Sequence, residues 1–168
     1  DWKALVIGDE PREKIELSHK NLKNLGFTNH SEVLNVFKKS SIAIACSRWE
    51  EPFGRTSLEA SSRGCAVIIS NRGGLPETIT NGVILKKINS TELFKSIENL
   101  ILNEKELKNL QFQSLKNFYL TDNYSSAKID KYRDKLLNSS KIQYNNLKLK
   151  NLKILHVTNF NERHDGRL

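Results

Sequence analysis

Short apolar runs alternate with segments of helical periodicity along most of the chain. The strand-length runs are WKALVIG from Trp2, IAIACS from Ile42, AVIIS from Ala66 and GVILKKI from Gly82. Near-continuous runs rich in Ile and Val are typical of parallel strands that are covered on both faces. The alternation therefore predicts an α/β fold, a parallel sheet with helices on both faces.

The N-terminal third of the chain carries two helical signals. Between Asp9 and Leu25 the spacing of apolar residues favours a helix, with a short strand near Leu22 to Phe27 as the alternative. Ser31 is a candidate N-cap for the following segment, EVLNVFKKS, which has an apolar face. This second segment is therefore predicted to be a helix that leads into the strand at Ile42.

The C-terminal half is predicted to be largely helical. From Ser90 onward, apolar residues recur at three- and four-residue spacing and predict two amphipathic helices that are broken near Asn103. Ser90 or Thr91 can cap the first of them. A last helix is predicted from Tyr124 to Leu137.

The stretch from Ser41 to Glu77 carries the candidate chemistry. It reads as strand, loop, helix, strand and loop, with TSLEASSR as a helix that ends at Gly64, and so predicts a βαβ unit. Glu51-Pro52-Phe53-Gly54 follows the first strand, and the helix opens near Thr56. Unpaired N–H groups and the helix dipole favour an anion such as phosphate at that point.

Two glutamates flank this helix start. Glu51 precedes the helix and Glu59 lies inside it, so both carboxylates can line the crevice at the strand ends, where open α/β sheets bind ligands. Carboxylates suit hydroxyl groups rather than phosphate, and a ligand can approach Gly54 closely because it has no side chain. A ligand with both phosphate and sugar fits these features together. The alternative is that Glu51 is a surface loop charge and Glu59 a solvated helix residue.

The motif around these glutamates resembles that of a known family. Glu51 and Glu59 stand as E-x7-E within EEPFGRTSLEASSRG, and AVIISNRGGLPE follows. This resembles the donor-site signature of retaining glycosyltransferases of the GT-B class, family 4, in their C-terminal Rossmann-like domain. The resemblance runs from Trp2 to Tyr132. It implies a Rossmann-like sheet that forms one half of a GT-B architecture.

The resemblance also implies roles for the residues of the motif. Glu51 matches the catalytic-site glutamate that holds hydroxyls of the donor sugar, and Glu59 matches the glutamate that holds the ribose hydroxyls. Phe53 and Gly54 match residues whose backbone lies along the sugar and the diphosphate.

Four further positions are candidates for donor binding. Arg55 and Thr56 stand at the helix start under the diphosphate, where family members often have aliphatic residues. Gly8 lies at the carboxyl end of the first predicted strand. Thr28 lies in the turn GFTNH, where the family presents backbone atoms to the nucleobase; loop packing is the alternative for this residue.

Length and composition indicate one well-buried domain in 168 residues. We expect the domain over residues 1–138, a polar linker over 139–150, and a terminal strand and loop over 151–168. That last segment resembles the start of another GT-B domain, with a plain terminal strand as the alternative. No run approaches 18 apolar residues and no signal-peptide pattern is present, so we expect a cytoplasmic protein, or one at the inner face of the membrane, of which this chain is a part.

Neither a metal nor a cofactor is expected. Cys46 and Cys65 fall at predicted buried strand ends without C-x-x-C spacing, and the four histidines show no ligand spacing. The net charge of +8 is concentrated in residues 128–168, which hold ten Lys or Arg against four Asp or Glu. Such a tail can bind anionic membrane or nucleic acid, but it is also explained as a solvated surface, and nucleic acid is the less favoured partner.

The predicted function is that of a retaining glycosyltransferase. It would bind a nucleotide-diphosphate sugar and transfer the sugar to an unknown acceptor, which is a glycan, lipid or protein. Transfer would also require an N-terminal GT-B domain that this sequence lacks. The 168 residues alone are therefore expected to be inactive. A non-catalytic nucleotide-sugar binding or regulatory module is the alternative. The family's first strand is also missing, and KILHVT, residues 153–158, is predicted to fill its slot between WKALVIG and IAIACS. Arg163 would then stand in for the diphosphate-binding arginine.

Overall fold

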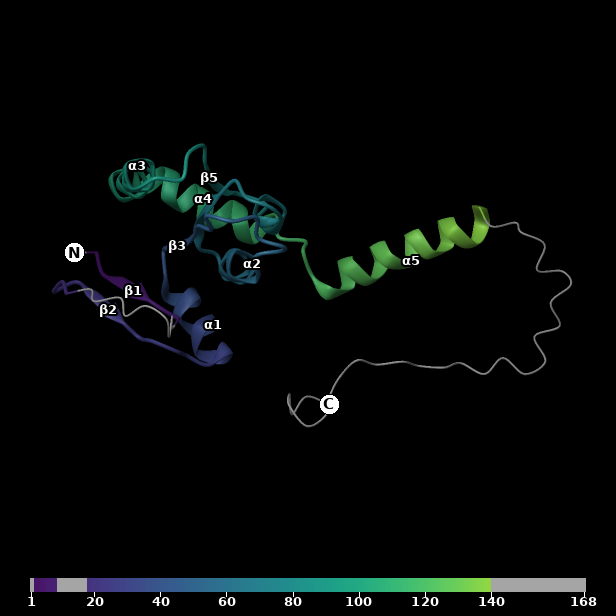
Figure 1. The fold of residues 1–168 in the computed structure, drawn as a ribbon, viewed down its shortest axis with the longest axis horizontal. Helices are drawn as coiled ribbons and strands as arrows, with labels where there is room; N and C mark the ends of the chain where they lie inside the picture. Colours follow the sequence, from purple (N-terminus) through teal and green to yellow (C-terminus); the bar gives the residue numbers. More distant parts are fainter. Residues whose placement is uncertain (1, 9–17, 140–168) are drawn as a thin grey trace, which may run out of the picture. The chain divides into compact units, whose positions relative to one another are not determined.

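The computed structural model describes residues 2–8 and 18–139 of the chain (Figure 1). Two compact units make up the chain, Asp1–Tyr124 and Ser125–Leu168. The predicted linker beyond Ser139, the segment KILHVT and Arg163 lie outside the described residues. The prediction that KILHVT completes the sheet therefore stays a prediction.

A parallel three-stranded sheet forms the centre of the first unit. Its strands β3 (Ile42–Ala45), β4 (Ala66–Ser70) and β5 (Gly82–Leu85) are hydrogen-bonded in the order β3-β4-β5. All five residues of β4 are buried, as its continuous apolar run predicts. The α/β fold with parallel strands is thus confirmed.

A second, two-stranded parallel sheet precedes it in the chain. β1 (Ala4–Val6) pairs with β2 (Leu22–Asn24). The possible strand near Leu22 is therefore confirmed. A helix does not extend to Leu25, because Leu22 pairs with Ala4 in the sheet. In the described part of the chain β1 pairs with β2 and not with β3.

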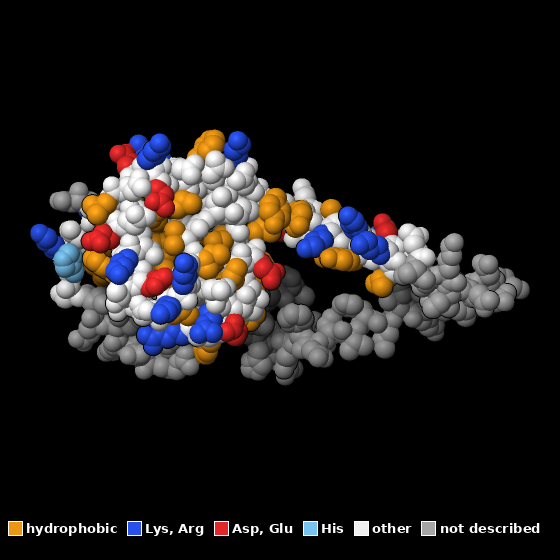
Figure 2. Space-filling view, turned by 90° about the horizontal axis from the view of Figure 1, so that it is seen from above, with side chains coloured by type: hydrophobic (Ala, Val, Ile, Leu, Met, Phe, Trp, Pro, Cys, Tyr) orange, Lys and Arg blue, Asp and Glu red, His pale blue; other side chains and the backbone are white. Residues whose placement is uncertain are grey.

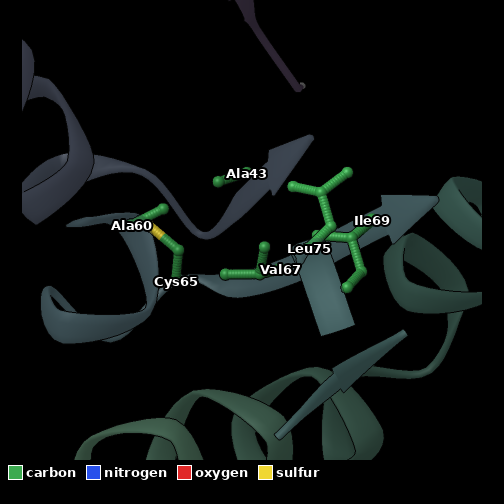
Figure 3. Close-up of a cluster of buried hydrophobic side chains, with 6 residues drawn as sticks. All are labelled: Ala43, Ala60, Cys65, Val67, Ile69 and Leu75. Carbon is green, nitrogen blue, oxygen red and sulfur yellow. The ribbon is translucent and has the colours of Figure 1, made fainter. Parts of the chain in front are cut away.

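Both faces of the central sheet carry a hydrophobic cluster. On one face Ala43, Val67 and Ile69 pack with Ala60, Cys65 and Leu75 (Figure 3). On the other face the cluster contains Ala66, Ile68, Leu85, Leu100 and Leu107. The two edge strands are less covered than expected, since Ile44 of β3 and Ile84 of β5 are nearly half exposed. Coverage on both faces therefore holds for β4 but not for its neighbours.

Five α-helices and one 3₁₀ turn complete the described residues. They are α1 (His30–Lys39), α2 (Arg55–Ser62), the 3₁₀ turn η1 (Leu75–Thr78), α3 (Ser90–Leu102), α4 (Glu104–Lys116) and α5 (Asp122–Ser139). The faces of the sheet are covered by α2 and η1 on one side and by α3 and α4 on the other. The predicted break near Asn103 and the helix end before Gly64 are confirmed.

The helix caps differ from the prediction. Asn29, Asn89 and Asn103, rather than Ser31, Ser90 or Thr91, cap α1, α3 and α4, and each side chain accepts a hydrogen bond from the N–H three residues later. An Asn just before each of these helices is as good a cap as Ser, and it starts the helix earlier. The Ser31 hydroxyl instead donates to Asn29 Oδ1 at 2.7 Å.

The last helix, α5, has charged and apolar residues along its length. Its exposed apolar side chains include Ile129 and Tyr132, and an Arg133–Asp130 ion pair of 3.2 Å lies beside them. On the face of the molecule that Figure 2 presents, Lys and Arg side chains lie among acidic and apolar ones. Within residues 2–8 and 18–139, no helix is long and apolar enough to cross a membrane.

Candidate functional site

The loops after β3 and β4 begin side by side at the carboxyl end of the sheet. Ser47, after β3, donates its N–H to the Ser70 hydroxyl at 2.9 Å, and that hydroxyl donates to the Ser47 carbonyl at 2.8 Å. Ser70 is the fully buried last residue of β4. One side chain thus replaces the ladder hydrogen bonds where the two strands part.

The two loops are joined again further along the chain. Gly73 donates its N–H to Glu50 Oε2 at 2.5 Å, and Gly74 donates to the Glu51 carbonyl at 2.7 Å. The Arg72 guanidinium pairs with Glu50 Oε1 at 3.1 Å. A Cβ on Gly73 would collide with the Glu51 carbonyl oxygen and would lie 2.6 Å from the Glu51 nitrogen. The glycines of the GGLPE motif are therefore needed because another loop lies against them.

Gly54 holds the start of α2 in place. Its φ of 89° and ψ of 58° put it in the left-handed region, and it is buried. A Cβ there would lie 2.5 Å from Leu75 Cδ2 and 3.2 Å from the Ser57 hydroxyl. Glycine is thus required here by the side chain of Leu75 in the hydrophobic core, and close approach of a ligand to the Gly54 backbone stays a prediction.

A buried pair of hydroxyl groups connects this turn to η1. The Ser57 hydroxyl lies 2.8 Å from the Gly54 carbonyl and 2.6 Å from the Thr78 hydroxyl, which in turn lies 2.7 Å from the Leu75 carbonyl. Both side chains are fully buried. Each hydroxyl has one proton to donate, so two of these three contacts are hydrogen bonds at any one time. The result is a fixed position for the first turn of α2.

The first N–H groups of α2 are left uncapped. Leu58 makes the first intrahelical bond, to the Gly54 carbonyl at 3.3 Å, and no side chain caps the helix. The N–H groups of Arg55, Thr56 and Ser57 therefore point out of the helix end without a partner inside it. The first turn also contains no acidic residue.

Glu59 lies one turn further on and contacts two cationic or polar partners. Its Oε1 lies 3.0 Å from His30 Nε2 and 3.4 Å from the Arg55 guanidinium, and its side chain is 20% exposed. The structure thus brings together the predicted residues Arg55 and Glu59. His30 was missed by the sequence analysis, because it stands 29 positions before Glu59 and only the packing of α1 against α2 joins them.

Glu51 differs from Glu59 in its surroundings. Its side chain is half-buried, and within the described part of the chain its carboxylate makes no hydrogen bond or ion pair. Two aromatic rings stand beside it in the sequence: Phe53, a predicted site residue, is 49% exposed, and Trp49, which the sequence analysis did not single out, is 75% exposed. The carboxylate that was expected to hold a ligand is thus not engaged by any side chain or N–H group that the structure describes.

The remaining candidates, Gly8 and Thr28, lie together at the end of the β1–β2 sheet. The Gly8 N–H donates to the Gly26 carbonyl at 2.9 Å, and the Thr28 hydroxyl donates to the same oxygen at 3.3 Å. Among the described residues, no hydrogen bond joins either residue to Glu51. Thr28 stands two residues before His30 in the sequence.

The cysteines are free thiols. Cys65 is fully buried, and burial raises the pKa of its thiol to about 11; burial also raises the pKa of the half-buried Cys46. In the part of the chain that the structure describes, no three His, Cys, Asp or Glu side chains gather as metal ligands would. The thiols thus act as small apolar side chains.

Known proteins resemble this chain in sequence. The family model described as "Glycosyl transferases group 1" matches residues 1–117. Spore coat protein SA of Bacillus subtilis (strain 168) is 30% identical over 83 residues, which cover 48% of this chain and 22% of that protein. A glycogen synthase of Mycobacterium tuberculosis (strain ATCC 25618 / H37Rv) is 38% identical over 58 residues, which cover 34% of this chain and 14% of that protein.

Solved structures resemble it in fold. Anabaena Alr3699/HepE in complex with UDP and glucose superimposes with a TM-score of 0.58 at 21% identity, over 82% of this chain and 40% of that chain. A glycosyltransferase from Rickettsia africae ESF-5 gives a TM-score of 0.64 at 23% identity, over 82% and 41%. The chain thus has the α/β fold of GT-B glycosyltransferases and spans about two fifths of these solved chains. Because the family model matches well over half of its residues, the chain belongs to the group 1 glycosyl transferases.

Proposed function

We propose that this chain is the donor-binding part of a retaining glycosyltransferase of family 4. It binds a nucleoside diphosphate sugar, and the protein transfers the sugar to an acceptor hydroxyl. The observation that carries the proposal is the combination, in one strand-end region, of an uncapped helix start, a carboxylate that no described residue binds and a second carboxylate one turn inside the helix. The complexes of Alr3699/HepE with UDP and glucose and with UDP-glucose support this ligand class.

The diphosphate is assigned to the start of α2. Its unpaired N–H groups and the positive end of the helix dipole favour an anion. The helices α1, α3 and α4 differ in this respect, because each has an Asn cap and at least one acidic residue in its first turn. Arg55 adds a positive charge at the helix start, where its side chain is 75% exposed and contacts Glu59 Oε1 at 3.4 Å. The start of α2 therefore favours an anion, because it lacks the capping side chain and the acidic residue that are present at the starts of α1, α3 and α4.

The hydroxyl groups of the donor are assigned to the two glutamates. His30 and Arg55 both contact Oε1 of Glu59, which leaves Oε2 as the acceptor for ribose hydroxyls. Glu51 has both oxygens available for the hydroxyls of the transferred sugar. Charged acceptors of this kind give stronger hydrogen bonds than neutral ones.

The chemistry that the chain supplies is stabilisation of the departing diphosphate. Charge develops on the diphosphate as the sugar–oxygen bond breaks, and fixed N–H groups at the helix start stabilise that charge without reorganising. The hydroxyl pair Ser57–Thr78 and the packing of Leu75 keep these groups in place. We propose that no metal or cofactor is required. The acceptor is a glycan, lipid or protein hydroxyl, bound in the protein with the contribution of an N-terminal GT-B domain.

Turnover of nucleotide sugars tests the proposal. The protein is incubated with UDP-, GDP- and ADP-glucose and their mannose and galactose counterparts, release of the nucleoside diphosphate is measured, and proton NMR gives the anomeric configuration of the product. We expect release with at least one donor and an unchanged anomeric configuration. Binding without turnover in the presence of acceptors would instead indicate a non-catalytic nucleotide-sugar module.

Two substitutions assign the roles of the glutamates. Glu59→Ala is expected to weaken nucleotide binding and Glu51→Ala chiefly to lower transfer, each by about 10- to 150-fold, since hydrogen bonds to charged groups contribute about 1.5 to 3 kcal/mol. Glu98→Ala is the matched control, because Glu98 is exposed on α3 and makes no ion pair or hydrogen bond through its side chain among the described residues. If both site variants behave like the control, the assigned roles are wrong.

A further inference from the structure

Two adjacent carboxylates at the end of β3 are used in opposite ways. Glu50 is 67% exposed, yet both of its oxygens are engaged, Oε1 by the Arg72 guanidinium at 3.1 Å and Oε2 by the Gly73 N–H at 2.5 Å. Glu51 is more buried, and its carboxylate has no partner among the described residues. Burial makes an unpaired charge costly, so the more buried glutamate is the one expected to have partners. Among the described residues the opposite is found, since Glu50 has partners and Glu51 has none.

The partners of Glu50 connect it to the backbone of Glu51. Gly73 binds the Glu50 side chain, and the next residue, Gly74, donates to the Glu51 carbonyl at 2.7 Å. A Cβ on Gly74 would lie 2.7 Å from the Pro52 carbonyl oxygen, so the two loops are in direct contact on both sides of Glu51. The main chain of Glu51 is therefore held by a loop that Glu50 itself fixes.

The strength of this connection lies in the N–H bond rather than in the ion pair. Arg72 and Glu50 are both largely exposed, and exposed ion pairs contribute little. A backbone N–H donated to a carboxylate is charge-assisted and has a fixed direction. Without it the Glu50 carboxylate no longer holds Gly73, while Gly74 still donates to the Glu51 carbonyl.

We propose that Glu50 is a positioning residue that sets the orientation of the Glu51 carboxylate toward the sugar of the donor. This inference rests on the proposed function, in which Glu51 binds the hydroxyls of the transferred sugar. Glu50 itself touches no substrate. Its loss therefore affects the recognition of the sugar and leaves the recognition of the nucleotide, which lies along α2 and Glu59, unchanged.

The test is the ratio between the affinity for a nucleotide sugar and that for the nucleotide alone. Dissociation constants of UDP, GDP and ADP and of their glucose conjugates are measured by calorimetry for the protein and its variants. Glu50→Ala is expected to weaken the preferred conjugate by at least about tenfold, which corresponds to 1.4 kcal/mol, while the affinity for the nucleotide changes by less than about twofold.

Two further variants separate the contacts. Glu50→Gln keeps an oxygen for the Gly73 N–H but loses the charge, and it is expected to recover most of the affinity for the conjugate. Arg72→Ala removes only the ion pair and is expected to stay within about fivefold of the unchanged protein, the upper limit for an exposed pair. If Glu50→Ala does not fold, Glu50→Asp is measured in its place: the shorter side chain draws the carboxylate away from the Gly73 N–H, and the same loss of affinity for the conjugate with unchanged affinity for the nucleotide is expected.

The possible results show whether the inference alone fails or the proposed function fails with it. Glu51→Ala is measured in parallel. Loss of the sugar-dependent affinity in Glu51→Ala but not in Glu50→Ala overturns the inference and leaves the proposed function standing. An equal loss of conjugate and nucleotide affinity in Glu50→Ala also overturns it, since that is the result of general destabilisation. An unchanged ratio in both variants overturns the assignment of Glu51 and the inference with it.

Discussion

Replacing Gly73 by alanine tests how closely the two strand-end loops fit together. Gly73 has a φ of 50°, a left-handed conformation that costs an alanine about 1 to 2 kcal/mol. The added Cβ would also collide with the Glu51 carbonyl oxygen and lie 2.9 Å from the Glu50 carbonyl carbon, all backbone atoms that cannot rotate away. Overpacking of this kind costs about 1 to 3 kcal/mol. We therefore expect Gly73→Ala to lower the free energy of unfolding by about 2 to 5 kcal/mol.

Gly26→Ala provides the matched control. Gly26 has nearly the same φ, 60°, but a Cβ there meets no atom of the described residues within 4 Å. It should cost only the conformational part, about 1 to 2 kcal/mol. Urea unfolding followed by far-UV circular dichroism and by tryptophan fluorescence measures both variants. Equal costs for the two substitutions would refute the close approach of the loops, and with it the physical reason for glycine in GGLPE.

Three further predictions concern the packing around the site. Gly54→Ala should destabilise the chain because its Cβ meets Leu75, and the cost should be smaller in a Leu75→Ala background; an additive double-mutant cycle would contradict this. Burial raises the pKa of Cys65 to about 11, so the folded chain keeps a proton that the unfolded chain loses near pH 9. Between about pH 8 and pH 11 the free energy of unfolding should therefore fall by on the order of 2 kcal/mol more than it does in Cys65→Ala. Urea unfolding at both pH values measures this difference. Asn29→Ala should cost about 1 kcal/mol and Ser31→Ala less, and the opposite order in thermal unfolding would restore Ser31 as the cap.

The sequence predicted well those features that depend on long apolar runs. The run AVIIS predicted the fully buried central strand β4, and three- and four-residue spacing predicted α3 and α4 with their break at Asn103. The E-x7-E motif predicted the family, because its residues lie within one loop and one helix. Local patterns of this kind determine local structure, so they can be recognised without knowledge of the tertiary fold.

The contacts that position the site could not be predicted in the same way. His30 meets Glu59 across 29 residues, and Glu50 meets Gly73 across 23, so both contacts arise only when separate elements pack together. The contact of Gly54 with Leu75 could not be predicted for the same reason, because the side chain of Leu75 comes from η1. The sequence thus located the candidate site but not the network that holds it.

A crystal structure of the protein with its preferred nucleotide sugar would show directly where the donor binds. We expect the diphosphate at the N–H groups of Arg55 to Ser57, the ribose hydroxyls within hydrogen-bond distance of Glu59, and the hydroxyls of the sugar at Glu51. The contacts of Glu59 Oε1 with His30 and Arg55 should persist, with Oε2 turned to the ribose. A nucleotide sugar bound away from the start of α2, or bound there with neither glutamate in contact with it, would contradict the account.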